Sequence, residues 1–532
     1  MLQCVTRAYI DSFDVRDGKR IVSRFSIRKA RNSKIIRRQR VVSCMSLGSK
    51  ILSDSLYSTF RTIITMLRSV IVVPLITKLL GADSFGIWST TFAFVVMMGN
   101  IGGLHLHGAM TRYGVSDTVK EQTYVDILSL SIITGAIISV AIGVIGVHLD
   151  IDSLVGNGYV DVDSLVAVSA VLVFLTILRR INLNFYRSKS NVKLYEIINT
   201  IKTLSEIAVL TTVFLFDGGI IHGMGALVAV SLILNVSLMS HIFKNYSVPW
   251  PNARNFPKYV RYGLPMVPAS LSQSLHQNAD KFLILFFLSP SAVGIYAVAY
   301  GVCGLFRNFT NVLTPSLYPR IAKSWDENNF GEITEVYKDI FRYYTIVAVP
   351  ALVGIVFVSV PLLEALSTAT VAEQGWILIP IMSVGMLLRG YENSLTYILT
   401  SAEKTANISK GVVLSTIVNI VLNLVLIPTY GIEGAAIGTL ISQSLLTAII
   451  YGYSVKNISI PLPTEIFVKS IVAAGFMALA LTVVPEFANP YVVLVVYPAI
   501  GVCTYFVTIY KLEGISRREL SSIKTVVLDR PK

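Results

Sequence analysis

The stretch SLHQNADKFLILFFLSPSAVGIYAVAY, residues 274–300, places charged side chains inside an apolar run that has the length of a membrane-spanning segment. A hydrocarbon core of ~30 Å takes about 20 residues of helix. Asp280 and Lys281 would lie at that depth, where a charge costs at least ~2.5 kcal/mol and normally faces protein or a water-filled cavity. The stretch therefore predicts two membrane helices joined by a short turn, with polar surroundings beside the first.

Apolar runs of this length recur along nearly the whole chain after residue 50. Of the 532 residues, 53% are hydrophobic and only 14% are charged, against about 25% charged in ordinary globular proteins. Strands in a membrane would have to close into a barrel with alternating apolar residues. We therefore expect an all-α polytopic membrane protein with about fourteen transmembrane helices and no soluble catalytic domain.

The basic excess of the chain is concentrated in residues 1–45. Twelve Lys and Arg against three Asp give this segment a charge of +9, out of a net +14 for the chain. Two interpretations stay open: a polybasic segment on anionic lipid headgroups, or a disordered cytoplasmic tail with no activity of its own, for which a start at Met45 is a further option. Because the charge lies in one tail, we expect no nucleic-acid partner.

The cysteines predict neither a disulfide framework nor a metal site. They are dispersed, with no CxxC spacing and no histidine at ligand spacing. They are Cys4, Cys44, Cys303 and Cys503.

Alternate connections between the expected helices differ in charge. One set is almost free of Lys and Arg and carries acidic residues such as Asp83, Asp217 and Glu433. The positive-inside rule places the other, basic set in the cytoplasm. That set comprises Arg112, Lys120, Arg179, Arg180, Arg187, Lys189, Lys193, Lys244, Arg254, Lys258, Arg261, Arg320, Lys323, Lys338, Lys404 and Lys410. Both termini are basic as well, so we expect them on the cytoplasmic side of the cell membrane, with an even number of spans.

The two halves of the chain echo each other. LGADSFGIW (residues 80–88) parallels LSPSAVGIY (residues 288–296), which places Gly86 and Gly294 208 positions apart. Two further pairs match at nearly the same offset: Leu178-Arg179 with Leu388-Arg389, and Gly225-Ala226 with Gly434-Ala435. The repeat predicts a six-helix lobe in residues 46–245, a second in parallel repeat in residues 246–458, and a helix pair with a cytoplasmic tail in residues 459–532. Transporters built this way bind substrate between their lobes.

Three blocks carry a family resemblance: YGLPMVPASLSQSLHQNADKFLILFFLSPSAVGIYAVAY (residues 262–300), LLGADSFGIW (residues 79–88) and NLVLIPTYGIEGAAIGT (residues 423–439). They resemble the Wzx-type polysaccharide transporters, the oligosaccharide flippases of the MATE/MOP superfamily. The resemblance covers most of residues 46–455. It implies a two-lobed transporter, not an enzyme, that moves a lipid-linked glycan by alternating access. Its implied partners are that lipid, membrane lipids and, left open, glycan-assembly proteins. No cofactor is expected, and coupling to Na⁺ or H⁺ stays open.

A cationic stripe marks the first expected span. Tyr57, Arg61, Thr65 and Arg68 fall within an ~80° arc of a helix, with Arg68 about 16 Å along the axis from Tyr57. Arginine suits bidentate capture of the phosphate oxygens that such a lipid would present. The alternative is that Arg61 snorkels to the interface and only Arg68 is buried.

Four further residues complete the candidate substrate-binding set. Arg307 approaches the cytoplasmic end of the eighth span and would face Arg68 if the lobes pack as in the family; the alternative is a bond to a helix-end carbonyl. Asp280 is expected to titrate, bind a coupling cation or contact sugar hydroxyls, or else to pair with an arginine on another helix. Lys281 lies beside it on a different face. Arg389 is included, although it is three residues from Glu392 and the two are typical of a structural pair.

Other polar residues in the spans are expected to be structural first. Lys202 and Glu206 are four apart and should pair. Asn100, His105 and His107 either line the cavity or are satisfied by hydrogen bonds. Asn419 and Asn423 share a face and are expected to join helices.

Two rival functions remain. A multidrug cation antiporter of the same superfamily should carry a carboxylate in the first helix of the N-terminal lobe, where this chain has Arg61 and Arg68. A membrane-embedded sugar polymerase or transferase generally needs a wide extracytoplasmic loop. The longest such loop expected among the first twelve spans covers only residues 149–162.

Overall fold

The computed structural model describes residues 24–114, 120–148, 160–313, 318–485, 487 and 489–515. Side chains are described from Leu56 onward, except those of Lys120, Val147, residues 305–313 and Pro319. In these ranges all of the regular secondary structure is helical.

The N-terminal lobe begins with α2 (Arg24–Gly102), in which two spans meet at Gly81. Gly81 has φ 89°, a conformation that glycine adopts without steric cost. The lobe continues with α3 (Leu106–Tyr113), α4 (Lys120–His148), α6 (Val162–Ser188), α7 (Val192–Leu215) and α8 (Ile220–Asn245). α2 begins at Arg24, so residues 24–45 of the basic tail are helical, and the expectation of disorder for residues 1–45 stays a prediction. No proline or glycine interrupts residues 24–45.

The C-terminal lobe follows a linker with η1 (Ala253–Asn255), α9 (Phe256–Gly263) and η2 (Leu264–Met266). Its helices are α10 (Val267–Phe287), α11 (Pro290–Leu313), α12 (Tyr318–Asp326), α13 (Phe330–Phe357), α14 (Ser359–Leu366), α15 (Ala369–Gly375), α16 (Leu378–Ser401) and α17 (Thr405–Val455). Gly431, at φ 63°, divides α17 into two spans as Gly81 divides α2. The last two helices are α18 (Thr464–Val483) and α19 (Pro490–Lys511).

The fourteen expected transmembrane helices are present in the described ranges. Nine helices are long and apolar enough to cross a membrane by themselves, and α2 and α17 each contain two spans. α16, bent by 62° from α15, and the more polar α10 and α11 complete the set. The expectation of an all-α polytopic fold is confirmed.

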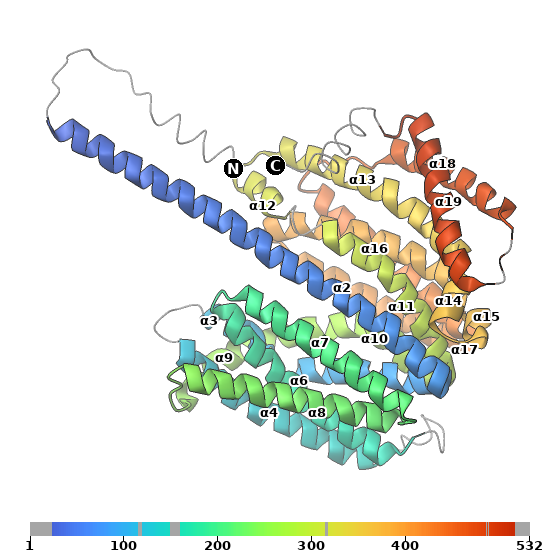
Figure 1. The fold of residues 1–532 in the computed structure, drawn as a ribbon, viewed down its shortest axis with the longest axis horizontal. Coiled ribbons are helices and arrows are strands. Elements are labelled where there is room, and N and C mark those ends of the chain that lie inside the picture. The colour runs from blue at the N-terminus through green and yellow to red at the C-terminus, as the bar shows by residue number, and fades with distance from the viewer. Residues whose placement is uncertain are drawn as a thin grey trace.

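The two lobes lie side by side, with the first half of α2 running along the seam between them (Figure 1). Across the seam, α2 packs against α10 and α11. α18 and α19 pack on the outside of the C-terminal lobe against α13.

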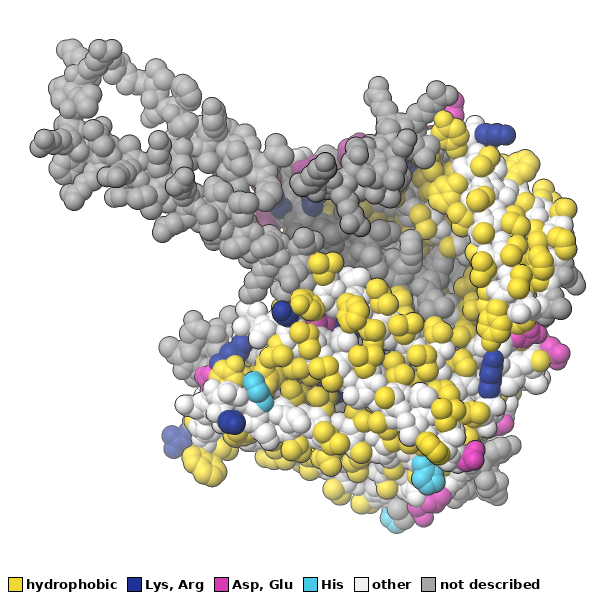
Figure 2. Space-filling model, viewed as in Figure 1, with side chains coloured by type: hydrophobic (Ala, Val, Ile, Leu, Met, Phe, Trp, Pro, Cys, Tyr) yellow, Lys and Arg dark blue, Asp and Glu magenta, His cyan; other side chains and the backbone are white. Residues whose placement is uncertain are grey.

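The outer surface is that of a multi-pass membrane protein. Apolar side chains cover the visible faces of the lobes (Figure 2). On α4 alone, Ile133, Ile137 and Val140 are each about half or more exposed. In the N-terminal lobe most Lys and Arg gather at one end of the helices and most Asp and Glu at the other (Figure 2). This distribution leaves a broad apolar surface for lipid.

One correction concerns the connection after the fourth span. α6 continues to Ser188, so Arg179, Arg180 and Arg187 are helical and do not lie in a connecting loop. Buried amides support the extension, because Asn182 accepts a hydrogen bond from the Tyr124 hydroxyl at 2.8 Å and donates one to Asn235 at 2.9 Å. Polar residues that suggest a loop in the sequence instead make their hydrogen bonds inside the lobe.

Candidate functional site

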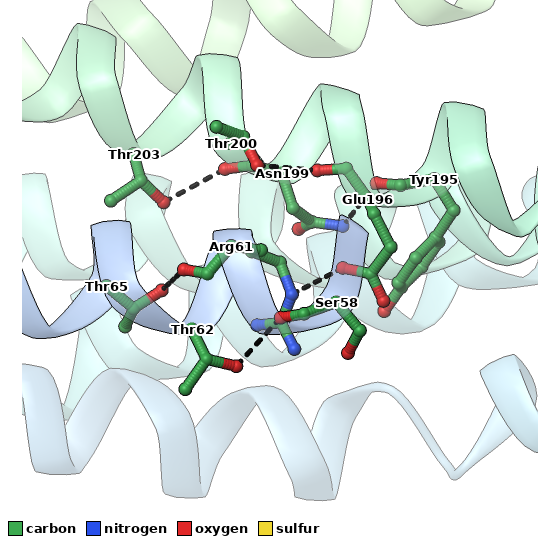
Figure 3. Close-up of polar contacts among 9 residues, drawn as sticks. All are labelled: Ser58, Arg61, Thr62, Thr65, Tyr195, Glu196, Asn199, Thr200 and Thr203. Atoms are coloured by element: carbon green, nitrogen blue, oxygen red, sulfur yellow. Dashed lines mark hydrogen bonds and ion pairs between the residues drawn. The ribbon is translucent and has the colours of Figure 1, made fainter. Parts of the chain in front are cut away.

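The arginine stripe of α2 faces α7 of the same lobe. Arg61 Nε donates to Glu196 Oε2 at 2.5 Å, and the close-up shows the guanidinium turned toward that carboxylate (Figure 3). The Arg61 side chain is 35% exposed, while Glu196 is buried. The Arg61 side chain therefore extends from the interior of the lobe toward its accessible surface.

Arg68 belongs to a cluster with more positive than negative charge. Its Nε lies 3.4 Å from Glu206 Oε2, while the other carboxylate oxygen, Oε1, accepts from Lys202 Nζ at 2.5 Å. Arg179 of α6 lies close enough to interact electrostatically with both Arg68 and Glu206. Arg68 and Lys202 thus share one carboxylate, with the cation of Arg179 near it.

The hydrogen bonding of the cluster is incomplete. Arg68 Nε and Glu206 Oε2 are buried, yet neither makes a hydrogen bond to a described residue. The Arg68 side chain is 29% exposed. Removing charges from water is costly unless they are paired and bonded, so the cluster favours a further anion. The guanidinium supplies the donor geometry that a phosphate would use.

Only part of this arrangement was predicted from the sequence. The predicted Lys202–Glu206 ion pair is confirmed. The sequence did not predict that Glu206 also pairs with Arg68, or that Arg61 pairs with Glu196. These carboxylates lie more than 130 positions from the arginines along the chain. One feature of the sequence could have indicated these partners: a second span, which forms α7, also carries charged residues.

A polar chain crosses the seam between the lobes. Arg180 Nη1 donates to Asn100 Oδ1 at 2.5 Å, and Asn100 Nδ2 donates to Ser274 Oγ of α10 at 2.7 Å. Beside it, His105 Nδ1 and Ser270 Oγ are 3.5 Å apart. Asn100 therefore joins the lobes through hydrogen bonds.

Asp280 lies inside the C-terminal lobe, 4% exposed. Its Oδ2 accepts from the Tyr296 hydroxyl at 2.6 Å and from Thr439 Oγ1 at 2.8 Å, and its Oδ1 accepts from Asn423 Nδ2 at 2.5 Å. Asn419 in turn bonds to Asn423 and Thr439, so both asparagines join helices as expected. Asp280 thus lies in a polar network of its own lobe, away from the arginine cluster on α2 and α7.

The structure describes fewer contacts for the three remaining candidates. Lys281 is half-buried on α10, and Arg389 is half-buried on α16. Arg389 is close enough to His276 and Glu392 to interact electrostatically. The expected Arg389–Glu392 ion pair does not form among the described contacts, and Glu392 accepts a hydrogen bond from Thr396 Oγ1 at 3.2 Å. Arg307 lies in α11, but its side chain is outside the described residues.

The candidates therefore form two groups. Arg61 and Arg68 lie on the N-terminal lobe, and Asp280 lies within the C-terminal lobe with Arg389 on a neighbouring helix. A role in substrate binding stays a prediction for all six residues.

One end of the seam is closed by the repeated glycines. A Cβ at Gly86 would lie 1.8 Å from the carbonyl oxygen of Pro290, and a Cβ at Gly294 would lie 2.0 Å from that of Ala82. Each glycine thus packs against the hairpin turn of the other lobe. The two turns meet at one end of the helix bundle. The N-terminal part of α2 extends beyond the opposite end (Figure 1).

Comparisons with known proteins agree with this architecture. The family model described as polysaccharide biosynthesis protein matches residues 51–325, more than half of the chain, and the MatE model matches residues 265–425. The probable flippase AglR of Haloferax volcanii is 26% identical over 475 residues, which cover 86% of this chain and 95% of AglR. The probable low-salt glycan biosynthesis flippase Agl15 of the same organism is 24% identical over 241 residues, 45% of this chain and 50% of Agl15.

Solved structures share the fold. The lipid II flippase MurJ, in an inward closed conformation, superposes with a TM-score of 0.69 at 16% identity, covering 90% of this chain and all of that chain. An inward-facing MATE multidrug transporter of the MOP superfamily gives 0.61 at 14% identity, covering 75% and 94%. From the family match, the chain belongs to the polysaccharide biosynthesis protein family, and it shares its fold with a MATE transporter of the MOP superfamily.

Proposed function

We propose that the chain is a flippase that moves a phosphate-linked lipid oligosaccharide across the cell membrane by alternating access, for the assembly of a surface polysaccharide or glycan. The observation that carries the proposal is the Arg68 cluster beside the seam, in which Arg68 and Lys202 share the Glu206 carboxylate and Arg179 adds a third cation nearby. The named flippases among its relatives, AglR and Agl15, support the same class. Since these are transporters, we assign the chain no catalysed reaction.

The mechanism begins with the seam closed at the Gly86–Gly294 contact and accessible from the other end. The phosphate binds Arg68, whose Nε lacks a hydrogen bond, and competes with Glu206 for the cationic cluster. Arg307, on α11 of the other lobe, is the second arginine that we propose for phosphate binding. The glycan occupies the space between the lobes and the lipid tail stays in the bilayer. Rocking of the lobes then separates the two glycine turns and opens the other side.

The orientation follows from charge. We assign the basic ends of the helices, with both termini, to the cytoplasm. The glycine turns then lie at the outer surface, and the cargo enters from the cytoplasmic side, where lipid-linked precursors carry their phosphate.

The experiment is headgroup translocation of a fluorescent polyprenyl-phosphate oligosaccharide in proteoliposomes. Removing a charge-assisted hydrogen bond costs about 1.5–3 kcal/mol, so we expect Arg68→Ala and Arg307→Ala each to slow translocation roughly 10- to 100-fold. Arg68→Lys keeps the charge but loses the planar fork, and should be intermediate.

Arg254→Ala, at an exposed position of the linker, is the matched control and should leave the rate unchanged. Gel filtration of each variant separates loss of function from loss of folding. Unchanged translocation by a folded Arg68→Ala, Arg307→Ala double variant would refute the site.

A multidrug antiporter is the second candidate, favoured by the MatE match to residues 265–425. Efflux of a cationic dye from the same liposomes, without movement of the phosphate-linked lipid, would transfer the assignment to drug transport.

A further inference from the structure

The two halves of α17 enclose a groove at the end of the C-terminal lobe opposite to Gly431. Lys404 Nζ donates to Asn457 Oδ1 at 2.5 Å, which holds the start and the end of this helical hairpin side by side. Between them lies a groove of about 310 Å³. Its rim carries Lys410 and Lys456, and its wall is apolar, with Leu414 and Ile449.

Along the helix axis, the groove lies at the level of a membrane surface. Lys410 and Gly431 are 21 residues apart, which corresponds to about 32 Å of helix, the thickness of a hydrocarbon core. Lysine at this level extends its ammonium group to the headgroups while its methylenes cover apolar surface. By the charge rule, this is the cytoplasmic surface.

The rim is cationic and has no counter-charge. No acidic residue lines the groove, and in the described part of the chain neither Lys410 nor Lys456 makes an ion pair. Lys456 Nζ lies 5.7 Å from the ring centroid of Tyr453, which also lines the groove. Two lysines from distant parts of the sequence therefore converge on one space.

An apolar track leads away from the groove along α17. Leu414, Ile417, Val421 and Leu424 recur at helical spacing and are 46–53% exposed. Such a stripe faces hydrocarbon in a membrane. A phosphate between the lysines would therefore have its chains directed along this stripe.

From these features, we propose that the groove binds an anionic phospholipid of the cytoplasmic leaflet. The lysines hold the headgroup phosphate, and the chains lie on Leu414 and the stripe beyond it. Anionic lipids attract basic groups at this surface, and the apolar wall favours a lipid over a soluble anion. The site lies away from the arginine cluster and does not depend on the flippase proposal.

Gly452 offers a way to fill the groove without damaging the fold. A Cβ at this position would meet no heavy atom within 4 Å, although Gly452 lines the groove. Gly452→Leu therefore places a side chain where the lipid would lie. Gly475 of α18 has the same open surroundings and provides the matched control.

The test measures binding of fluorescent phosphatidylglycerol to the purified full chain in detergent, with phosphatidylcholine of the same chains as the neutral comparison. We expect Lys410→Gln and Lys456→Gln each to weaken phosphatidylglycerol binding about fivefold, and Gly452→Leu to weaken it at least as much. Lys338→Gln, an exposed lysine on α13, and Gly475→Leu should bind as the native chain does.

Two results would overturn the proposal. One is equal binding of phosphatidylglycerol by the native chain, the lysine variants and Gly452→Leu. The other is competition by glycerophosphoglycerol, the soluble headgroup, as effective as that of the intact lipid, which would make the groove a site for free anions. Because no glycan lipid is present, either result leaves the flippase proposal standing.

Discussion

Asp280 is a buried carboxylate whose three hydrogen-bond donors are all neutral. The hydroxyls of Tyr296 and Thr439 and the amide of Asn423 bind it. Asn423 Oδ1 is buried beside it and has no hydrogen-bond partner among the described residues. Carboxylate, amide and hydroxyl oxygens are ligands that hard cations prefer. The site is therefore our candidate for a coupling cation.

We expect Na⁺ to raise the melting temperature of the purified chain relative to choline. Saturation at 100 times the Kd corresponds to about 2.7 kcal/mol. Asp280→Asn should abolish this increase, because the amide brings no negative charge. Asp217→Asn, at an exposed position, is the control and should keep it. An equal Na⁺ effect in Asp280→Asn would exclude this residue as the cation ligand.

At the scale of single residues, the sequence identified which polar side chains are unusual but not what they contact. Asp280, Arg61 and Arg68 stand out because a charge within an apolar span is expensive. Their partners come from other helices, more than 130 positions away for Glu196, Glu206 and Asn423. Helical periodicity carries no information on such tertiary contacts.

At the scale of helices, the repeated hairpin turns determine how closely the lobes approach. Gly86 and Gly294 each have a backbone carbonyl of the other lobe where a Cβ would be. A side chain at either position cannot be accommodated by a rotamer change, since the obstacle is backbone. The closed contact at this end of the seam therefore depends on glycine.

We expect Gly86→Val to shift the protein toward the state in which this end of the seam is open. Spin labels at Ser84 and Ser291, on the two turns, should report a longer distance by double electron-electron resonance. Gly225→Val is the control, because a Cβ at Gly225 meets nothing within 4 Å. The same distance distribution in native chain and Gly86→Val would show that the turns do not form the gate.

The internal repeat could be recognised in the sequence, but the contact that the repeated turns make between the lobes could not. The offset between Gly86 and Gly294 predicted two lobes in parallel repeat. The structure shows in addition that the two glycines pack against each other's turns across the lobes. One helix end was also predicted too early: Arg179, Arg180 and Arg187 were assigned to a connection, although α6 continues to Ser188.

At the scale of the whole molecule, the direction of transport depends on which end of the bundle faces the cytoplasm. Asp217, between α7 and α8, and Glu403, between α16 and α17, lie in exposed turns at opposite ends by the charge rule. Both have φ 57°, so they form a matched pair of positions for substitution.

We expect Asp217→Cys to react with a membrane-impermeant maleimide in intact cells, and Glu403→Cys to react only after permeabilisation, in a chain whose native cysteines are replaced. This outcome would place the Gly86–Gly294 contact at the outer surface and the lysine groove at the inner one. The reverse labelling would invert both assignments. The Arg68 cluster would then be accessible from outside in this conformation, and a precursor made in the cytoplasm could not enter it without a prior opening of the glycine turns.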